Sequence, residues 1–510
     1  MAFEYWFVSR PKRQLTSILN SLIAFSDTCI GKIWSGNHEL QLSFEDELGN
    51  RNITQHGNLR ARRTSQGGGG ARTMFKQMKD LGLIFTEDEN GFCRLTLIGE
   101  KLIRGEISLV EAMRLQLHRY QYPSATSWSG SGAVDRSFKI HPFQFMFRLL
   151  LDSRLKNYLT MEEMSGIIIH RAKSDDSLQD VIERILRYRN DRYSEFVPDT
   201  QTQTFNNVAN TFFNYIDLTQ YVDRGQKIIG IKSNKRDRVE EFIEENPKFI
   251  PHPEFQEIYQ RYYGRGNSAK DLRNFNSTRQ ISKRELIELK IQREYILLTL
   301  KTPISKITPS IVQTISEKTG IDEKFIEKFL RKNYSGGAVD DFFAMYRELA
   351  RMGTSGARDF EKATCEIFQK IFGMNARHVG AIGNTPDVFV ESEKYCGIID
   401  NKAYRNGYSI SGNHSRVMID VYIPNYRKYG ETSLPLEFFM YIADSFGKNI
   451  NSQIQKIHRD TGVNGSAISV EVLIELAQNY SKLNFDHEIL RRLFSLNREI
   501  QLSDLDLIHE

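Results

Sequence analysis

Residues 383–404, GNTPDVFVESEKYCGIIDNKAY, hold the side chains of this chain that are best placed for chemistry. Asp387 follows a proline and opens one apolar run, while Asp400 and Lys402 end the next. Because successive side chains of a β-strand point to opposite faces, Asp400 and Lys402 should share one face. The pattern is therefore Pro-Asp followed by Asp-x-Lys.

Two carboxylates and a lysine in this pattern suit the hydrolysis of phosphodiester bonds. That reaction requires a water molecule to be deprotonated beside a polyanion and negative charge to be stabilised on the phosphate. Two aspartates can hold a hard divalent cation such as Mg²⁺ with open water positions, and a lysine can orient the attacking water. The pattern predicts Asp387 and Asp400 as catalytic metal ligands and Lys402 as a further catalytic residue.

A further carboxylate, Glu361, lies in the preceding segment RDFEKATCEIFQKIFG. Helical spacing in that segment predicts an amphipathic helix whose inward face includes Phe360 and Phe368. Glu361 is a candidate catalytic residue that would complete the metal site. The alternative interpretation is an ordinary surface glutamate.

The placement of these residues depends on a predicted hairpin. The apolar runs 388–390 and 396–399 flank the turn-forming residues 391–394. A Gly-Gly segment in NYSGGAVDD marks a boundary upstream, so we expect the last domain at residues 337–510.

Three long segments contain or surround the motif: ARDFEKATCEIFQKIFGMNARHVGAIGNTPDVFV, YCGIIDNKAYRNGYSI and LEFFMYIADSFGKNINSQIQKIHRDTGVNGSAISVEVLIEL. They resemble the cleavage domain of the FokI type IIS restriction endonucleases over about residues 340–505. The resemblance implies an α/β PD-(D/E)xK nuclease fold, with a mixed central sheet flanked by helices. It also implies that Asp387, Asp400 and Lys402 carry metal binding and catalysis.

Residues 59–79, LRARRTSQGGGGARTMFKQMK, form the most concentrated cationic stretch of the N-terminal half. A helix is expected from about Ala71, followed by a hairpin around Glu89-Asn90-Gly91. A helix followed by such a wing is the outline of a winged helix-turn-helix, which places the helix in the major groove of DNA. A scaffold helix packed on a hairpin is the alternative. The predicted DNA-binding residues are Arg60, Arg62, Arg63, Arg72, Lys76, Gln77 and Lys79.

The same outline returns in residues 206–245, with a helix, two strands around Arg224-Gly225 and a second helix. The segment between the two outlines reads as helical, with a capping box from Thr160 to Glu163. We therefore expect a mainly helical N-terminal region with winged-helix-like units. Its predicted parts are a DNA-recognition domain at 1–150, a second winged-helix-like or helical recognition domain at 151–250 and a helical connector at 251–336.

Scattered blocks of the N-terminal region read WFVSRPKR, KDLGLIFTEDENGFCRLTLIGEKL, LHRYQYPSA, KIHPFQFMFRLLL and RILRYRNDR. They resemble the AlwI and MlyI group of type IIS and nicking endonucleases over roughly residues 1–250. The resemblance implies that this region recognises a short asymmetric DNA site. A sequence-reading region joined to a non-specific nuclease is what cleavage outside the recognition site demands.

The composition of the 510 residues is that of a globular protein, with 40% hydrophobic and 26% charged residues. A formal net charge of +5 is too small to prove a polyanionic partner, so the placement of the charges must decide. Four cysteines without CxxC spacing indicate reduced thiols and not a zinc site. With no targeting segment or long apolar run, we expect a cytoplasmic prokaryotic protein without a membrane partner.

These features predict a type IIS restriction endonuclease that binds double-stranded DNA and cuts it with Mg²⁺. A cognate DNA methyltransferase is expected in the same restriction-modification system. Two alternatives stay open. One is a strand-specific nicking endonuclease, or a subunit of a heterodimeric one, and the other is a DNA-binding regulator with an inactive nuclease fold.

The FokI resemblance also implies a transient homodimer through the nuclease domain. Residues 411–430, SGNHSRVMIDVYIPNYRKYG, align with the dimerisation region of that family and fit a helix with apolar anchors that include Met418 and Tyr422. Arg416 and Asp420 lie one turn apart. In a two-fold pairing, Arg416 of one copy would meet Asp420 of the other. An intrahelical pair between the two residues is the alternative.

Overall fold

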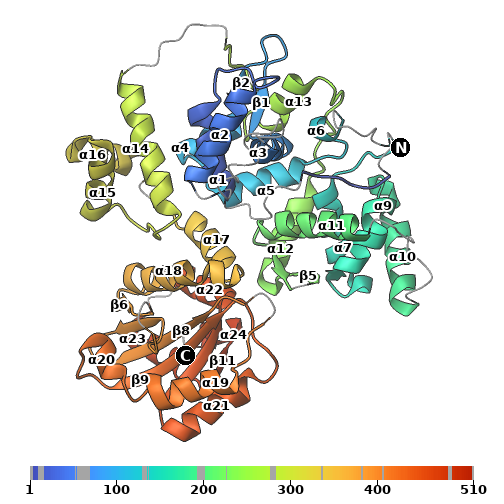
Figure 1. Ribbon diagram of the computed structural model, residues 1–510. Coiled ribbons are helices and arrows are strands. Elements are labelled where there is room, and N and C mark those ends of the chain that lie inside the picture. The colour runs from blue at the N-terminus through green and yellow to red at the C-terminus, as the bar shows by residue number, and fades with distance from the viewer. Residues whose placement is uncertain are drawn as a thin grey trace. The chain divides into compact units, whose positions relative to one another are not determined.

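The computed structural model describes most of the chain, which forms two compact units, Met1–Ile296 and Leu297–Glu510 (Figure 1). The described residues are 4–9, 17–51, 53, 69–128, 135, 137–191, 202–225, 227–275, 283–334, 337–380, 383–404, 407–480 and 485–507. None of the helices within these ranges is long and apolar enough to span a bilayer. The finer division into four domains stays a prediction.

The first unit opens with three helices and a hairpin: α1 (Ser17–Thr28), α2 (His38–Asn50), α3 (Gly69–Asp80), β1 (Ile84–Thr86) and β2 (Cys93–Leu95). The strands are antiparallel, and Gly91 supplies the left-handed φ of 68° that their turn requires. Bridges from Ile30 and Ile33 add the segment between α1 and α2 to the hairpin. The helix expected from Ala71 and the hairpin after it are confirmed.

More helices follow in the same unit: α4 (Leu97–Arg104), α5 (Leu109–Arg119), α6 (Ala125–Trp128), α7 (Pro142–Leu151), α8 (Met161–Glu163), the π-helix η3 (Met164–Ile168), α9 (Ile169–Arg171), α10 (Leu178–Asn190), α11 (Thr202–Asp217), α12 (Arg236–Glu244) and α13 (Gln256–Tyr263). A three-stranded antiparallel sheet has the order β3 (Tyr158–Thr160), β5 (Ile228–Ile231), β4 (Val222–Arg224). The predicted capping box is confirmed, because Thr160 Oγ1 accepts from the Glu163 amide and the Glu163 carboxylate accepts from the Thr160 amide. The helix and strand pattern expected for 206–245 is confirmed as well.

The helix α14 (Lys283–Thr299) crosses the division between the units, and α15 (Pro309–Thr319) and α16 (Glu323–Asn333) open the second unit. The remaining helices of that unit are α17 (Asp340–Leu349), α18 (Ala357–Lys370), α19 (Gly412–Val417), the π-helix η7 (Met418–Tyr422), α20 (Tyr426–Gly430), α21 (Ile450–Thr461), α22 (Val470–Asn479), α23 (His487–Phe494) and α24 (Leu502–Leu507). The helical character expected for the connector is confirmed.

A mixed six-stranded sheet forms the centre of the second unit, as Figure 1 shows. Its order is β11 (Arg498–Ile500), β10 (Asn464–Ser469), β9 (Leu436–Ala443), β8 (Cys396–Lys402), β7 (Val388–Glu391), β6 (Asn375–His378). The strands β6, β7 and β8 are antiparallel neighbours, whereas β8, β9, β10 and β11 run parallel. The expected mixed sheet flanked by helices and the hairpin across residues 391–394 are both confirmed.

Helices cover both faces of this sheet, and each face has its own hydrophobic core. The first core joins α17, α18, α22 and α23 to the sheet and contains Phe360 and Phe438. The second joins η7 and α21 to the opposite face and contains Met418 and Phe439. Because neighbouring side chains of β9 alternate between faces, this one strand supplies aromatic rings to both cores. The sheet is therefore buried on both sides.

Glycines on the strands beside β9 make room for these rings. Gly397 of β8 is the register partner of Phe438, and Gly465 of β10 is the register partner of Phe439. A Cβ atom at Gly397 would lie 2.2 Å from Phe438 Cζ, and one at Gly465 would lie 2.1 Å from Phe439 Cζ. Each ring thus packs directly over a bare glycine of the next strand.

We expect Gly397→Ala and Gly465→Ala each to lower the free energy of unfolding by about 1–3 kcal/mol, because both rings are fully buried and cannot move aside without overpacking. Chemical denaturation of the purified variants measures the change. Gly412→Ala is the matched control, since no atom lies within 4 Å of its added Cβ. Unfolding of Gly397→Ala at the wild-type denaturant concentration would contradict this account of the packing.

Candidate active site

Asp387 and Asp400 meet where the strands β7 and β8 part. The last register pair of the hairpin is Val388 with Ile399, and the amide of Asp387 donates to the carbonyl of Ile399 at 3.1 Å. Beyond Ile399, β8 continues to Lys402 beside β9 alone. The two aspartates therefore lie next to each other at the open end of the hairpin.

Asp400 and Lys402 share one face of β8, as the period of two predicts. The Lys402 Nζ lies 2.7 Å from Asp400 Oδ2, and Asp400 is only 4% exposed. This contact holds the lysine in a defined position beside the carboxylate.

Asn401, between them, anchors the strand on the other face. Its Nδ2 donates to Thr364 Oγ1 of α18 at 2.6 Å, and Thr364 Oγ1 also lies 2.7 Å from the Tyr346 hydroxyl. Its backbone N–H donates to Asp387 Oδ2 at 2.6 Å, which fixes the orientation of that carboxylate. The variable residue of the Asp-x-Lys motif thus connects the catalytic strand to the core helix α18.

Glu361 projects from α18 toward the same place. Its Oε2 lies 2.7 Å from His378 Nε2 at the end of β6, and the Glu361 side chain is only 15% exposed. A Cβ on Gly380 would lie 3.1 Å from both Glu361 Oε2 and Asp387 Oδ1. The two carboxylates therefore face each other across a glycine that leaves the space open. The surface interpretation of Glu361 does not fit this position.

The three carboxylates carry more negative charge than their surroundings balance. Burial raises the pKa of Asp387, and the charges of Asp400 and Glu361 raise it further, against the opposing effects of Lys402 and the Asn401 N–H. A hard divalent cation would relieve this repulsion. Within the described residues, no group of three or more Asp, Glu, His or Cys side chains has the geometry of a metal site. A cation would accordingly rest on Asp387 and Asp400 with water in its other positions, which Mg²⁺ accepts.

Aromatic residues that the sequence did not single out as catalytic surround this cluster. The Tyr408 hydroxyl lies 2.8 Å from His414 Nδ1, and the Tyr408 ring centroid lies 6.0 Å from Lys402 Nζ. Burial raises the pKa of Tyr422, with further contributions from Asp400 and Asp387. No spacing rule connects these residues to the motif, because a loop and the π-helix η7 bring them to it.

The predicted DNA-binding residues divide into three groups. Arg60, Arg62 and Arg63 lie outside the described residues. Arg72 is exposed and donates to Gln41 Oε1 at 3.1 Å, while Lys76 is half-buried with its Nζ 5.3 Å from the Phe7 ring centroid. Arg72 and Lys76 stay candidates for DNA contact.

Gln77 and Lys79 do not belong to a DNA-reading surface, which corrects the prediction for both. Gln77 is fully buried, and its Nε2 donates to the Tyr215 hydroxyl at 3.0 Å. The Lys79 Nζ donates to Gln256 Oε1 at 2.6 Å, and burial lowers the pKa of Lys79 to about 8. Gln77 lies three residues from Met74, on the same inward stripe of α3.

The residues predicted for dimer contact are exposed. Arg416 lies in the last turn of α19 and donates to Asn413 Oδ1 at 3.1 Å, and Asp420 lies in the π-helix η7. Among the described ion pairs there is none between Arg416 and Asp420. Met418 is fully buried in the second core, so it is not a dimer anchor as the helical pattern had indicated.

Two family models match this chain. Residues 320–501 match the family model of the FokI cleavage domain, and residues 79–335 match the model of the AlwI restriction endonuclease. The type II restriction enzyme StsI of Streptococcus sanguinis is 29% identical over 133 residues, which are 24% of this chain and 22% of that enzyme. The type II restriction enzyme FokI of Planomicrobium okeanokoites is 23% identical over 226 residues, which are 40% of this chain and 38% of that enzyme.

The aligned segments thus span well under half the length of these relatives. A solved structure of restriction endonuclease FokI aligns with 98% of this chain and 100% of its own at 14% identity and a TM-score of 0.31. Because the AlwI model covers just over half of the residues, the chain belongs to the AlwI restriction endonuclease family, and it carries a cleavage domain of the FokI type toward its C-terminus.

Proposed function

We propose that this protein is a type IIS restriction endonuclease that recognises a short asymmetric site in double-stranded DNA and cleaves outside it with Mg²⁺. The observation that carries the proposal is the cluster of Asp387, Asp400 and Lys402 at the open end of the β7–β8 hairpin, in which Asp400 is buried. It lies in the second unit, whereas most of the region that matches the AlwI family, residues 79–335, lies in the first. Such a separation suits cleavage at a distance from the recognised sequence.

The roles of the residues follow from their positions. Asp387 and Asp400 would hold the cation, which when bound stabilises charge on the phosphate and lowers the pKa of a water molecule. The Asn401 N–H keeps Asp387 Oδ2 in place, so that carboxylate needs little reorganisation. Lys402, held 2.7 Å from Asp400, orients the attacking water and stabilises the negative charge that develops on the phosphate. Glu361 adds negative charge beside Asp387, and His378 holds it there.

This arrangement argues against an inactive nuclease fold. A domain used only for association would have no reason to keep Asp387, Asp400 and Glu361 close together, because their repulsion lowers stability. The choice between a double-strand cutter and a nicking enzyme depends on whether two centres act together. A DNA methyltransferase that protects the recognition site is expected beside either enzyme.

We expect Asp387→Asn, Asp400→Asn and Lys402→Ala each to reduce plasmid cleavage in Mg²⁺ by about 10²-fold or more, while binding of the cognate duplex persists. In thermal unfolding, Mg²⁺ should raise the midpoint of the wild type but not that of Asp387→Asn. Without metal, Asp387→Asn should unfold at a higher temperature than the wild type, because one source of repulsion is gone.

Glu393→Gln is the matched control, since Glu393 lies exposed in the turn of the same hairpin. It should cleave DNA and respond to Mg²⁺ as the wild type does. Wild-type turnover by Asp400→Asn would refute the assignment of the site.

The recognition helix is tested on the outer face of α3. We expect the double variant Arg72→Ala and Lys76→Ala to lose about 1–3 kcal/mol of binding free energy, with a smaller dependence on salt if phosphates are contacted. Thr73→Ala, an exposed uncharged neighbour, should bind as the wild type does. Unchanged affinity and salt dependence in the double variant would place the recognition helix elsewhere.

The pairing of cleavage domains is tested by charge reversal. Asp420→Arg should suppress double-strand breaks at low enzyme concentration, because it sets arginine against arginine across a two-fold interface. Mixing it with Arg416→Asp should restore cleavage of a shared substrate. Double-strand breaks by Asp420→Arg alone at the wild-type rate would exclude this pairing. A wild type that accumulates only nicked circles would identify a nicking enzyme instead.

A further inference from the structure

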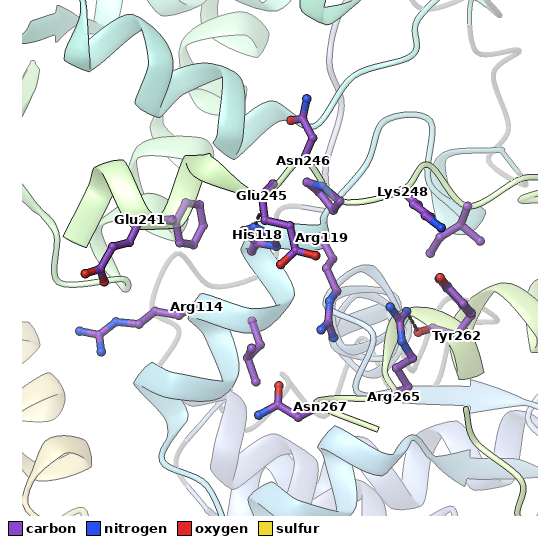
Figure 2. Close-up of a pocket in the computed structure, with 14 residues that line it drawn as sticks. Arg114, His118, Arg119, Glu241, Glu245, Asn246, Lys248, Tyr262, Arg265 and Asn267 are labelled. Atoms are coloured by element: carbon purple, nitrogen blue, oxygen red, sulfur yellow. Dashed lines mark hydrogen bonds between the residues drawn. The ribbon is translucent and has the colours of Figure 1, made fainter. Parts of the chain in front are cut away.

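A cavity of about 560 Å³ lies in the first unit, apart from the helix α3 and its hairpin. Side chains of α5 and α12 line it, together with the segment after α12 and the residues at and beyond the end of α13 (Figure 2). Its cationic side chains are Arg114, Arg119, Lys248 and Arg265, and its carboxylates are Glu241 and Glu245. The lining therefore has more positive than negative side chains.

Arg119 and Arg265 are held by neutral groups. The Arg119 Nη1 donates to the carbonyl of Gly266 at 2.6 Å. The Arg265 Nη1 donates to the carbonyl of Tyr262 at 2.7 Å, and its guanidinium lies 3.8 Å from the Tyr262 ring centroid. Within the described part of the chain, neither guanidinium lies within 4.0 Å of a carboxylate. Both are fixed in position without having their charge neutralised.

The two guanidinium groups also act on each other. Burial lowers the pKa of Arg119, and the positive charge of Arg265 lowers it further. Two like charges at close range cost free energy unless an anion lies between them. A guanidinium presents five N–H donors, and only one donor of each group is used by these carbonyls.

The other titratable groups of the cavity do not cancel this charge. Glu241 is paired with Arg238 at 2.9 Å. Glu245 is exposed, and its charge raises the pKa of Arg119 without forming a close ion pair. Burial lowers the pKa of His118, which favours the neutral imidazole and leaves the cavity's charge to its arginines and lysine.

We propose that this cavity binds a phosphate group, and that the phosphate is one of the backbone of bound double-stranded DNA. The inference rests on the proposed function. Guanidinium pairs match phosphate oxygens through parallel N–H donors, and phosphate contacts fix a protein on the duplex without reading its sequence. The mouth of the cavity carries exposed residues, among them Lys248 and Asn267, so a phosphate on a polymer can reach it.

Binding of DNA tests the proposal in the full-length protein without Mg²⁺. Arg119→Gln and Arg265→Gln should each weaken binding of cognate and unrelated duplexes alike by about tenfold, and flatten the plot of log affinity against log salt by about one unit. Lys248→Ala, at the exposed mouth, should act in the same direction with less effect. Arg236→Gln is the control, because Arg236 lies on α12 outside the lining and pairs with Glu240.

Thermal unfolding of each variant establishes that it is folded, and Lys248→Ala keeps the test valid if a buried arginine variant unfolds. Unchanged affinity and salt dependence in folded Arg265→Gln and Lys248→Ala would overturn the proposal. Calorimetric titration with pyrophosphate distinguishes a free anion as the ligand. If the variants lost pyrophosphate binding but kept wild-type DNA affinity, the DNA assignment would be wrong. If the wild type bound no duplex at all, the proposed function itself would fail.

Discussion

Asp387, Asp400 and Glu361 lie close together, with Asp400 buried and the other two half-buried, and the second unit must hold them there against their mutual repulsion. The strand β8 carries Asp400 and fixes its position. It lies inside the sheet, paired with β7 on one side and β9 on the other, and its Asn401 side chain is fixed to α18. Beyond Ile399 the strand is paired with β9 alone, so its end cannot shift to separate the charges without breaking the hydrogen bonds to β9 and the contact of Asn401 with α18. The site is therefore strained electrostatically and rigid mechanically.

The rigidity comes from how the sheet is packed on its two faces. Phe438 and Phe439 of β9 extend into opposite cores, and each ring lies over a glycine of the neighbouring strand. This interlock fixes β8 and β10 relative to β9 by steric contact as well as by hydrogen bonds. Two hydrophobic cores, one on each face of the sheet, also cover most of the catalytic strand.

Local periodicity was enough to predict the parts of the site that belong to one element. Asp400 and Lys402 share a face because a strand alternates, and the hairpin that brings Asp387 beside them follows from two apolar runs and a turn. Glu361 could be placed on a helix but not beside Asp387, because that contact depends on how α18 packs on β6 and on the open space at Gly380. Tyr408, His414 and Tyr422 come from a loop, the short helix α19 and the π-helix η7, and no spacing in the sequence connects them to the motif.

The errors on α3 have a related cause. The cationic, amphipathic pattern of this helix suggested that its polar residues face DNA. Gln77 and Lys79 instead donate hydrogen bonds to residues that are distant in the sequence, Tyr215 and Gln256. Helical spacing alone places Gln77 with Met74 on the buried stripe, so its burial could have been inferred. The burial of Lys79 could not, because it depends on the packing of α13.

Each of the two regions for which we propose a ligand has an excess of charge, negative in the carboxylate cluster and positive in the cavity. The cluster of Asp387, Asp400 and Glu361 has three carboxylates beside one lysine, Lys402, and a divalent cation would complete it. The cavity around Arg119 and Arg265 has the reverse excess, held in place by carbonyl groups and an aromatic ring. Each region keeps its charged side chains fixed before a ligand binds, and that preorganisation lowers the free-energy cost of binding.

On the proposed function, a DNA phosphate is the ligand that both regions have in common. The arginines would contact it directly, and the aspartates would contact it through a cation. A polyanionic substrate would thus relieve the repulsion in both units, and this makes substrate binding a source of stability for the folded protein as well as the start of its reaction.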